Sequence, residues 1–305
     1  MQFQKYQHVE KLGNLEVDGI LNGSCFISSK IDGTNASVWV DENHKIQCGS
    51  RNRQLTIEND NAGFCRAINE DSQFDGVRKL LTHHPHLRLF GEFLCPHSLK
   101  TYRDDAWRQF YVFDIIDEKD PENWRYVPYD CYKELLDEYE IEYIPCLAEI
   151  NNPTEEKLIA IMKQNNYLIE DGKGIGEGII IKNYQFVNKF GRKTWAKIVT
   201  SEFKEKHIKV MGHVKMEDKE SNEAKIINKS CTEALIAKTY AKIVNTNEGW
   251  SSKFIPQLLG TVYHDLVCEE LFNSLKKLKN GKIVDFSKLE KLCKQKVKQV
   301  KKELF

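Results

Sequence analysis

The hydrophobic pattern of the chain changes near residue 220, and this change limits the folds that it can adopt. Before about residue 200, short runs of alternating apolar and polar residues are mixed with a few amphipathic segments, as expected of strands and helices in one domain. These elements follow no regular strand–helix alternation, which favours an α+β domain of twisted antiparallel sheets with flanking helices over a doubly wound fold. We predict this domain for residues 1–220 and a small all-helical domain for residues 221–305.

The individual elements of the first domain are predicted from the periodicity of apolar residues. The predicted strands are Cys25–Ile27, Ala36–Val40, Ile46–Cys48, Leu87–Phe90, Phe110–Ile116, Gly178–Lys182 and Trp195–Val199. The predicted helices lie near Phe74–His83, Tyr129–Tyr139 and Thr154–Asn165.

The helical domain is predicted from apolar residues at three-to-four spacing. Ala224–Asn245 and Ser251–Leu278 have this spacing, and the last segment opens with the capping-box pattern Ser287-Lys288-Leu289-Glu290. From residue 201 onward there are 21 Lys and no Arg against 14 acidic residues, a net charge of +7 that leaves −7 on residues 1–200. A basic region on an acidic body fits a polyanionic partner, although a solvated lysine-rich helix face accounts for the charge equally well.

The cysteine spacing and the hydropathy indicate in which cellular compartment the protein is found. Nine cysteines occur singly, with no pair at Cys-x-x-Cys spacing, so reduced thiols are favoured over a zinc knuckle. There is no apolar run of transmembrane length, and the first twenty residues lack the order of a signal peptide. We therefore expect a cytoplasmic protein with no membrane partner.

Lys30 lies in the segment Ser28-Ser29-Lys30-Ile31-Asp32-Gly33-Thr34-Asn35, between two predicted strands. This segment presents an amine beside a carboxylate on a tight Gly-Thr-Asn corner, which suits an amine that must be held still while it attacks. A lysine nucleophile must be neutral, and since its ordinary pKa is about 10.4, nearby cations or a metal ion would favour the reactive form. On its own, a Lys-x-Asp-Gly string is more often an ordinary hairpin turn.

Further segments place polar residues of catalytic type on predicted strands. They are Gly49-Ser50-Arg51-Asn52-Arg53, Leu89-Phe90-Gly91-Glu92-Phe93, Phe110-Tyr111-Val112-Phe113-Asp114, Glu177–Lys182 and Trp195–Val199. Lysines can surround phosphates, carboxylates can hold ribose hydroxyls or Mg²⁺, and a phenylalanine offers a flat face to a base. The candidates for these roles are Lys30, Lys182 and Lys197, then Asp32, Glu92 and Glu177, and finally Phe113. The set suits a nucleoside triphosphate.

With these motifs the sequence resembles the covalent nucleotidyltransferases, a group of ligases and capping enzymes. It is most similar to the RNA ligase 2 family of phage RNA ligases and kinetoplastid RNA-editing ligases, over roughly residues 1–210. Lys30–Asn35 matches the nucleophile motif of the family, and Glu177–Lys182 and Trp195–Lys197 match its last two motifs. By resemblance Arg51 contacts the nucleotide, Glu92 binds the ribose and Phe113 stacks on adenine.

The resemblance implies an ATP-dependent RNA ligase that acts through lysyl-AMP. Lys30 would attack the α-phosphate of ATP, and the AMP would pass to an RNA 5′-phosphate before a 3′-hydroxyl displaces it. Asp32 and Asn35 would order the surroundings of Lys30, Glu177 would bind Mg²⁺ (or Mn²⁺), and Lys182 and Lys197 would contact phosphate. The expected partner is RNA with 3′-hydroxyl and 5′-phosphate ends, as a nicked duplex or a broken tRNA, and the expected state is a monomer.

The sequence departs from the family pattern at two positions. Val199 replaces the second lysine of the final motif, so that a phosphate contact is missing or comes from Lys204 or Lys206. Asp32 stands where close relatives often have histidine, and this difference makes the site more similar to that of DNA ligases.

The spacing within one motif raises a separate question of geometry. Glu177 and Lys182 are five residues apart, which in a straight strand places them on opposite faces. A bend or bulge at Gly176 or Gly178 would bring both side chains to the same site.

Other functions stay open from the sequence. A DNA ligase or capping enzyme normally has an OB-fold after the last motif, where this chain is helical, and capping requires GTP. A non-catalytic RNA-binding relative is the remaining alternative, supported by Val199. Gly191-Arg192-Lys193-Thr194 is similar to a P-loop but lacks its first glycine and the following helix, and is predicted to be a turn.

Overall fold

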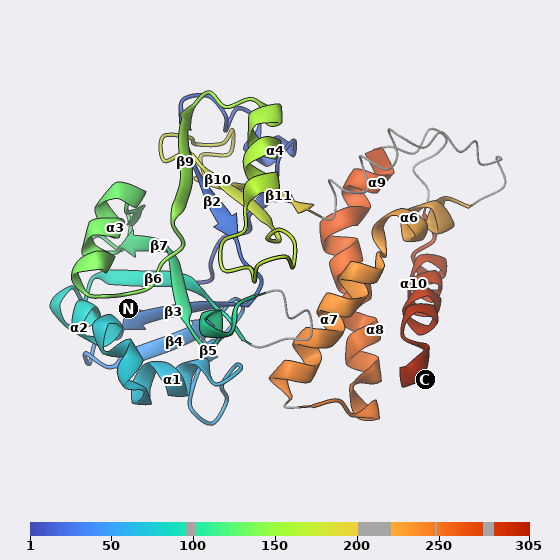
Figure 1. Cartoon of the computed structure of the whole chain (residues 1–305), viewed down its shortest axis with the longest axis horizontal. Coiled ribbons are helices and arrows are strands. Elements are labelled where there is room, and N and C mark those ends of the chain that lie inside the picture. The colour runs from blue at the N-terminus through green and yellow to red at the C-terminus, as the bar shows by residue number, and fades with distance from the viewer. Residues whose placement is uncertain (96–101, 201–220, 248, 277–283) are drawn as a thin grey trace. The chain divides into compact units, whose positions relative to one another are not determined.

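The computed structural model describes residues 1–95, 102–200, 221–247, 249–276 and 284–305, and is shown in Figure 1. These residues fall into two compact units, one formed by the described residues up to 200 and the other by those from 221 onward. The domain boundary predicted near residue 220 lies outside the described residues, as do Lys204 and Lys206. Among the described residues, none of the helices has both the length and the apolar character needed to span a membrane.

The first unit is built on two sheets, which confirms the α+β class. One sheet has the strand order β1-β11-β10-β2-β9 and the other the order β5-β4-β3-β6-β7-β8. Neighbouring strands are antiparallel except for the pair β1 and β11. The first sheet consists of β1 (Glu10–Lys11), β2 (Ser24–Lys30), β9 (Cys146–Asn151), β10 (Gly178–Lys182) and β11 (Ala196–Val199). The second consists of β3 (Thr34–Val40), β4 (Ile46–Ser50), β5 (Gln54–Leu55), β6 (Leu87–Phe93), β7 (Phe110–Asp117) and β8 (Arg125–Tyr126).

Helices cover the outer face of each sheet. α1 (Phe64–Glu70), α2 (Asp75–His83) and α3 (Tyr129–Glu138) pack on the second sheet around a core that includes Val38 and Leu89 (Figure 1). α4 (Glu155–Gln164) packs on the first sheet, and its Leu158 and Met162 contact a smaller core. The side chain of Thr154 accepts a hydrogen bond from the Lys157 amide and so fixes the start of α4.

An aromatic cluster joins the inner faces of the two sheets. Phe90 and Ile116 from the second sheet pack with Trp195, Tyr184 and Tyr6. Phe26 and Ile180 of the first sheet border the same cluster. The inner faces of the two sheets therefore face each other. Residues from both sheets at the border of this cluster can contact the same ligand.

The second unit contains only helices in the residues that the structure describes. They are α6 (Asn222–Ser230), α7 (Glu233–Thr246), α8 (Ile255–Asp265), a π-helical segment (Leu266–Leu271), α9 (Phe272–Lys276) and α10 (Phe286–Val300). Their shared core includes Ile236, Leu258, Leu289 and Val297. Each apolar stripe is thus buried within the unit, as its three-to-four spacing requires.

Two predictions for this unit are wrong in detail. The predicted helix Ala224–Asn245 is interrupted, because the Thr232 side chain accepts a hydrogen bond from the Leu235 amide and begins a new helix. The predicted capping box at Ser287 is not formed. Asp285 caps α10 instead, with its side chain accepting from the Lys288 amide at 3.1 Å.

Candidate active site

Lys30 is the last residue of β2, at the point where the chain crosses from one sheet to the other. Residues 31–33 form the corner, and β3 begins at Thr34. The amide of Gly33 donates to Oε1 of Glu92 at 2.9 Å, and the amide of Asp32 donates to the hydroxyl of Tyr102 at 2.8 Å. A Cβ atom at Gly33 would lie 2.4 Å from the Phe93 carbonyl oxygen, so the corner requires glycine there.

The amine of Lys30 is paired with Glu177. Its Nζ lies 2.5 Å from Oε2 of Glu177, and the two side chains are 24% and 16% exposed. The pair is therefore held by structure yet reachable by a ligand. Glu177 immediately precedes β10, and its carbonyl accepts a hydrogen bond from the Thr200 amide at 2.7 Å.

The position of Glu177 outside the strand answers the question that its spacing raised. β10 pairs residue by residue with β2 from Gly178 to Lys182 and with β11 from Gly178 to Ile181, so no bulge occurs at Gly178, and the chain instead bends at Glu177, just before the strand. The alternation of side chains applies within the strand, and the backbone before it is free of that rule. The side chain of Glu177 can therefore point toward Lys30, although a spacing of five residues would place it on the opposite face from Lys182 in a straight strand.

The register places three lysines on one face of the first sheet. Residues directly opposite each other on neighbouring strands share a face. Gly178 pairs with Lys30, Phe26 pairs with Lys182 and Ile180 pairs with Lys197. Since Gly178, Ile180 and Lys182 alternate along β10, all three lysines lie on its inner side. Lys30 and Lys182 are four strand steps apart, or about 13 Å.

Val199 shares this face, opposite Gly178. The position that holds a second lysine in similar sequences is thus separated from Lys30 by β10, and it presents an apolar side chain.

Lys182 forms a buried ion pair that the sequence analysis did not predict. Its Nζ lies 2.7 Å from Oδ1 of Asp114, with side chains 6% and 0% exposed, and it also donates to the Phe113 carbonyl. Oδ2 of Asp114 accepts from the Tyr6 hydroxyl and from Nε1 of Trp195 at 3.0 Å. Burial, and next the Asp114 charge, raise the pKa of Tyr6, which therefore stays a hydrogen-bond donor.

Phe113 lies on a β-bulge. Phe90 pairs with Asp114 while Gly91 pairs with Val112, which leaves Phe113 as the extra residue of β7. Bulges redirect side chains and are frequent beside active sites. The Phe113 ring is half-buried, 5.0 Å from the Tyr6 ring and 5.8 Å from Nζ of Lys182. The bulge of this site is therefore in β7.

For the other predicted site residues, the structure gives a position in the fold but no distance to Lys30. Asn35 lies directly opposite Glu92 in the register of β3 and β6, so the two share a face. Asp32 is buried in the corner itself. Arg51 stands apart in the exposed turn after β4, where its Nη2 lies 2.9 Å from Nδ1 of His8.

Sequence reasoning assigned no role to Tyr102 or Asp114, although both contact predicted site residues. One signal for Asp114 was available. A carboxylate within an apolar strand must be paired when it is buried, and Asp114 interrupts such a run.

Within the residues that the structure describes, no three His, Cys, Asp or Glu side chains gather as a metal cluster. Mg²⁺ is usually held by one or two carboxylates together with substrate phosphates. Glu177 remains the candidate protein ligand.

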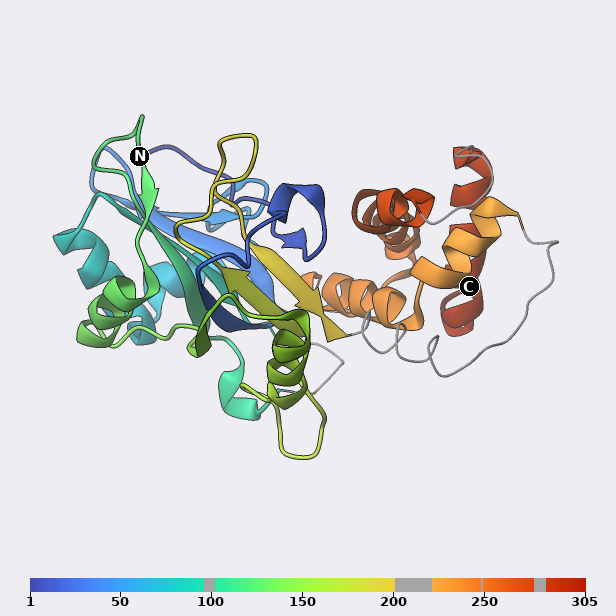
Figure 2. The same cartoon turned by 90° about the horizontal axis from the view of Figure 1, so that it is seen from above.

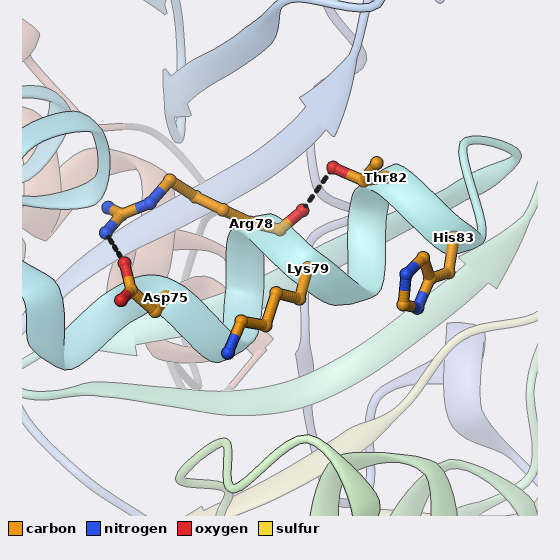
Figure 3. A pocket seen from close by; sticks show the side chains of 5 residues that line it. All are labelled: Asp75, Arg78, Lys79, Thr82 and His83. Carbon is orange, nitrogen blue, oxygen red and sulfur yellow. Dashed lines mark hydrogen bonds and ion pairs between the residues drawn. The ribbon is translucent and has the colours of Figure 1, made fainter.

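A shallow hollow of about 310 Å³ lies on the surface of the first unit, lined by Asp75, Arg78, Lys79, Thr82 and His83. All five residues belong to α2, and Figure 3 shows Arg78 directed toward Asp75. None of the predicted site residues lines it, so it is not part of the candidate active site.

The match to a family model shows that the protein is a member of the covalent nucleotidyltransferase superfamily. Residues 23–199 match the RNA ligase family model. Since this match covers more than half of the chain, the chain belongs to the RNA ligase family.

Solved structures of the RNA ligase from Naegleria gruberi are similar to this chain. A variant with ATP and Mn has 20% sequence identity and a TM-score of 0.50, and the match covers 67% of this chain and 58% of that chain. A second variant, with AMP and Mn, has 20% identity and a TM-score of 0.49 over the same shares, and a structure with PPi has 21% identity and a TM-score of 0.47 over 68% and 58%. This chain thus matches 58% of the Naegleria enzyme, at an identity that shows a shared fold. No curated protein matches the chain.

Proposed function

We propose that the protein is an ATP-dependent RNA ligase, which joins RNA 3′-hydroxyl and 5′-phosphate ends through lysyl-AMP and AMP-capped RNA. The observation on which this depends most is the Lys30 amine, partly exposed at the crossing of two facing sheets and 2.5 Å from the Glu177 carboxylate. Membership of the RNA ligase family supports the reaction class. The ATP and Mn found with the Naegleria enzyme support the choice of nucleotide and metal.

The first step is attack by Lys30. A bond forms between Nζ and the α-phosphorus of ATP while the bond from that phosphorus to the bridging oxygen breaks, and pyrophosphate leaves. The amine can attack only after it has left its ion pair with Glu177 and lost a proton to solvent, because Glu177 must stay ionised to hold a cation. A divalent cation held by Glu177 would neutralise phosphate charge and draw the carboxylate away from Lys30.

The corner beside Lys30 suits the sugar of the nucleotide. Glu92 is already hydrogen-bonded to the Gly33 amide, so its carboxylate is fixed close to the nucleophile, with Asn35 beside it in the register. Phe113, redirected by its bulge, would stack on the adenine.

Three basic residues would contact the phosphates. Lys197 lies on the same sheet face as Lys30. To bind a phosphate, Lys182 would have to break its ion pair with Asp114. Arg51 would have to break its contact with His8. Positioning and charge stabilisation then supply most of the catalysis.

Intact mass after incubation with ATP and Mg²⁺ tests the proposal. The wild-type protein should gain the mass of one AMP, while Lys30→Ala and Lys30→Arg should gain none, because neither variant has a primary amine at that position. An adduct on folded Lys30→Ala would show that the assignment is wrong. Parallel incubation with GTP, and sealing of nicked duplex RNA, nicked DNA and single-stranded RNA, separates an RNA ligase from a capping enzyme or a DNA ligase.

One observation favours a second candidate, an RNA-binding relative that has lost activity. Val199 places an apolar side chain on the face that would hold phosphate. Absence of any adduct with ATP or GTP, together with retained RNA binding, would support this candidate.

A further inference from the structure

The loop that joins β10 to β11 presents an exposed phenylalanine between two cations. Phe190 is 56% exposed, and its ring centroid lies 5.1 Å from Nζ of Lys189 and 5.7 Å from Cζ of Arg192. Val187 in the same loop is 52% exposed. Figure 2 shows the loop, in gold, extending beyond the ends of the two strands.

The tip of this loop is closed by one buried side chain. Oδ1 of Asn188 accepts hydrogen bonds from the amides of Phe190 and Arg192, both at 3.0 Å. The Asn188 amide donates to the Arg192 carbonyl, and Gly191, at a φ of +75°, donates to the Asn188 carbonyl. The backbone under Phe190 is therefore fixed by a turn over residues 188–191, which overlaps the predicted turn at Gly191 only.

The N-terminal segment anchors the loop at two further points. Oε2 of Glu16 accepts from Nδ2 of Asn188 at 2.9 Å and from Nη2 of Arg192 at 3.3 Å. At the base of the loop, Nδ2 of Asn183 donates to the carbonyls of Ile20 and Asn22 at 3.0 and 2.8 Å. An exposed ring on such a braced loop loses little entropy when it binds a ligand.

A single exposed apolar side chain needs no explanation by itself. The combination here is more specific, because single-stranded nucleic acid is held by aromatic rings that stack on bases and by cations that contact the backbone. The loop also joins the two strands that bear Lys182 and Lys197. We propose that Phe190 stacks on an unpaired base of the RNA substrate while Lys189 and Arg192 contact its phosphates. This proposal rests on the proposed function.

The register of β2 and β10 determines how far the proposed Phe190 contact lies from the RNA ends that are joined. The loop leaves β10 after Lys182, about 13 Å along the strand from the residue opposite Lys30. At ~3.4 Å per stacked nucleotide, the base on Phe190 lies on the order of four or more nucleotides from the joined end. Phe190 lies at the tip of the loop and is not among the residues proposed to bind ATP, so AMP attachment to Lys30 should not depend on it.

The test measures the affinity of the full-length protein for a labelled single-stranded RNA, with AMP attachment measured in parallel. Phe190→Ala should weaken RNA binding by about 5- to 150-fold, as removal of one stacked base predicts. Phe190→Leu should weaken it similarly and Phe190→Tyr should not, because only tyrosine keeps the ring. Ile57→Ala, which alters another exposed apolar side chain of the same unit, is the matched control and should leave affinity unchanged.

Salt dependence tests the cations. Lys189→Ala should reduce the slope of log affinity against log salt by about 0.7, because the variant neutralises one phosphate fewer. AMP attachment should be equal in all these variants.

Equal RNA affinity of wild type and Phe190→Ala would overturn the proposal, and a simultaneous change in sedimentation would assign the loop to a protein contact instead. Binding weakened equally by Ile57→Ala would also overturn it. Failure of the wild-type protein to attach AMP would refute the proposed ligase, and the RNA affinities would still decide whether the loop binds RNA.

Discussion

Nζ of Lys182 lies 2.7 Å from Oδ1 of Asp114, and the carboxylate is fully buried between the two sheets. The Asp114 carboxylate also accepts hydrogen bonds from Tyr6 and Trp195. It therefore connects β7 to β10 and to the N-terminal segment, next to Phe113. The pair thus links the packing of the sheets to the ring that we propose for adenine binding.

Removal of Asp114 should destabilise the first unit. Asp114→Ala leaves the Lys182 ammonium buried without its partner, which typically costs about 3–5 kcal/mol. The free energy of unfolding in urea measures this effect. The double variant Asp114→Leu with Lys182→Met should recover much of the stability, and equal stability of Asp114→Ala and wild type would contradict the structure.

Removal of the Glu177 charge should slow AMP attachment without unfolding the protein. Glu177→Gln keeps the size of the side chain but gives a poor metal ligand and removes the charge that pairs with Lys30. We expect a rate lower by about 10²- to 10³-fold, the usual effect of removing one electrostatic group from a site. The rate of adduct formation by mass measures it, with Glu170→Gln as an exposed acidic control; equal rates for the two variants would remove Glu177 from the mechanism.

A lysine at position 199 should restore a phosphate contact. Val199→Lys places an ammonium opposite Gly178, on the face shared by Lys30 and Lys197. A hydrogen bond to a charged group contributes about 1.5–3 kcal/mol, so adduct formation should be about tenfold faster or more. Val199→Leu controls for size. If the lysine variant is folded but no faster, that phosphate contact already comes from another residue.

The helical unit should become less stable in acid through Glu223. Its carboxylate accepts a hydrogen bond from the Asp285 amide and pairs with Lys288, and these contacts, the amide first, lower the pKa of Glu223 to about 2. Because the ordinary pKa is higher, near 4.3, this stabilisation is complete above pH ~4.3 and disappears as the pH falls toward 2.

Glu223→Gln should therefore cost on the order of 1–2 kcal/mol at neutral pH and less near pH 2. Thermal unfolding of the full chain at several pH values measures this difference. Glu233→Gln, at the start of α7, is the control. If the stability difference between Glu223→Gln and wild type does not change with pH, the lowered pKa is not that of Glu223.

The helical unit is proposed to hold RNA through its lysines, which give the chain a net charge of +7 after residue 200. The cores of the first unit consist of its own residues, so deletion of residues 223–305 should spare AMP attachment. Sealing should become weaker and less sensitive to salt, because fewer phosphates are contacted. Sealing assays across salt concentrations test this, and unchanged sealing by the truncated protein would refute the proposed role.

The sequence by itself determined the local features of this protein. A short run of isoleucines predicted β10 with its observed bounds, and three-to-four spacing predicted α3 to within one residue. The corner at Lys30 was also predictable, because a glycine and a following strand are properties of a few neighbouring residues. Such features depend on side-chain periodicity and on backbone conformation, both of which are local.

Only the tertiary structure decided which distant groups meet. Glu177 and Lys30 are 147 residues apart, and Asp114 and Lys182 are 68 apart. The bulge at Phe113 arises where two strands pair, and the cap of α10 is fixed by Glu223 from another helix. Periodicity within one strand or helix does not specify its partners, because those depend on how the sheets and helices pack to bury their apolar faces.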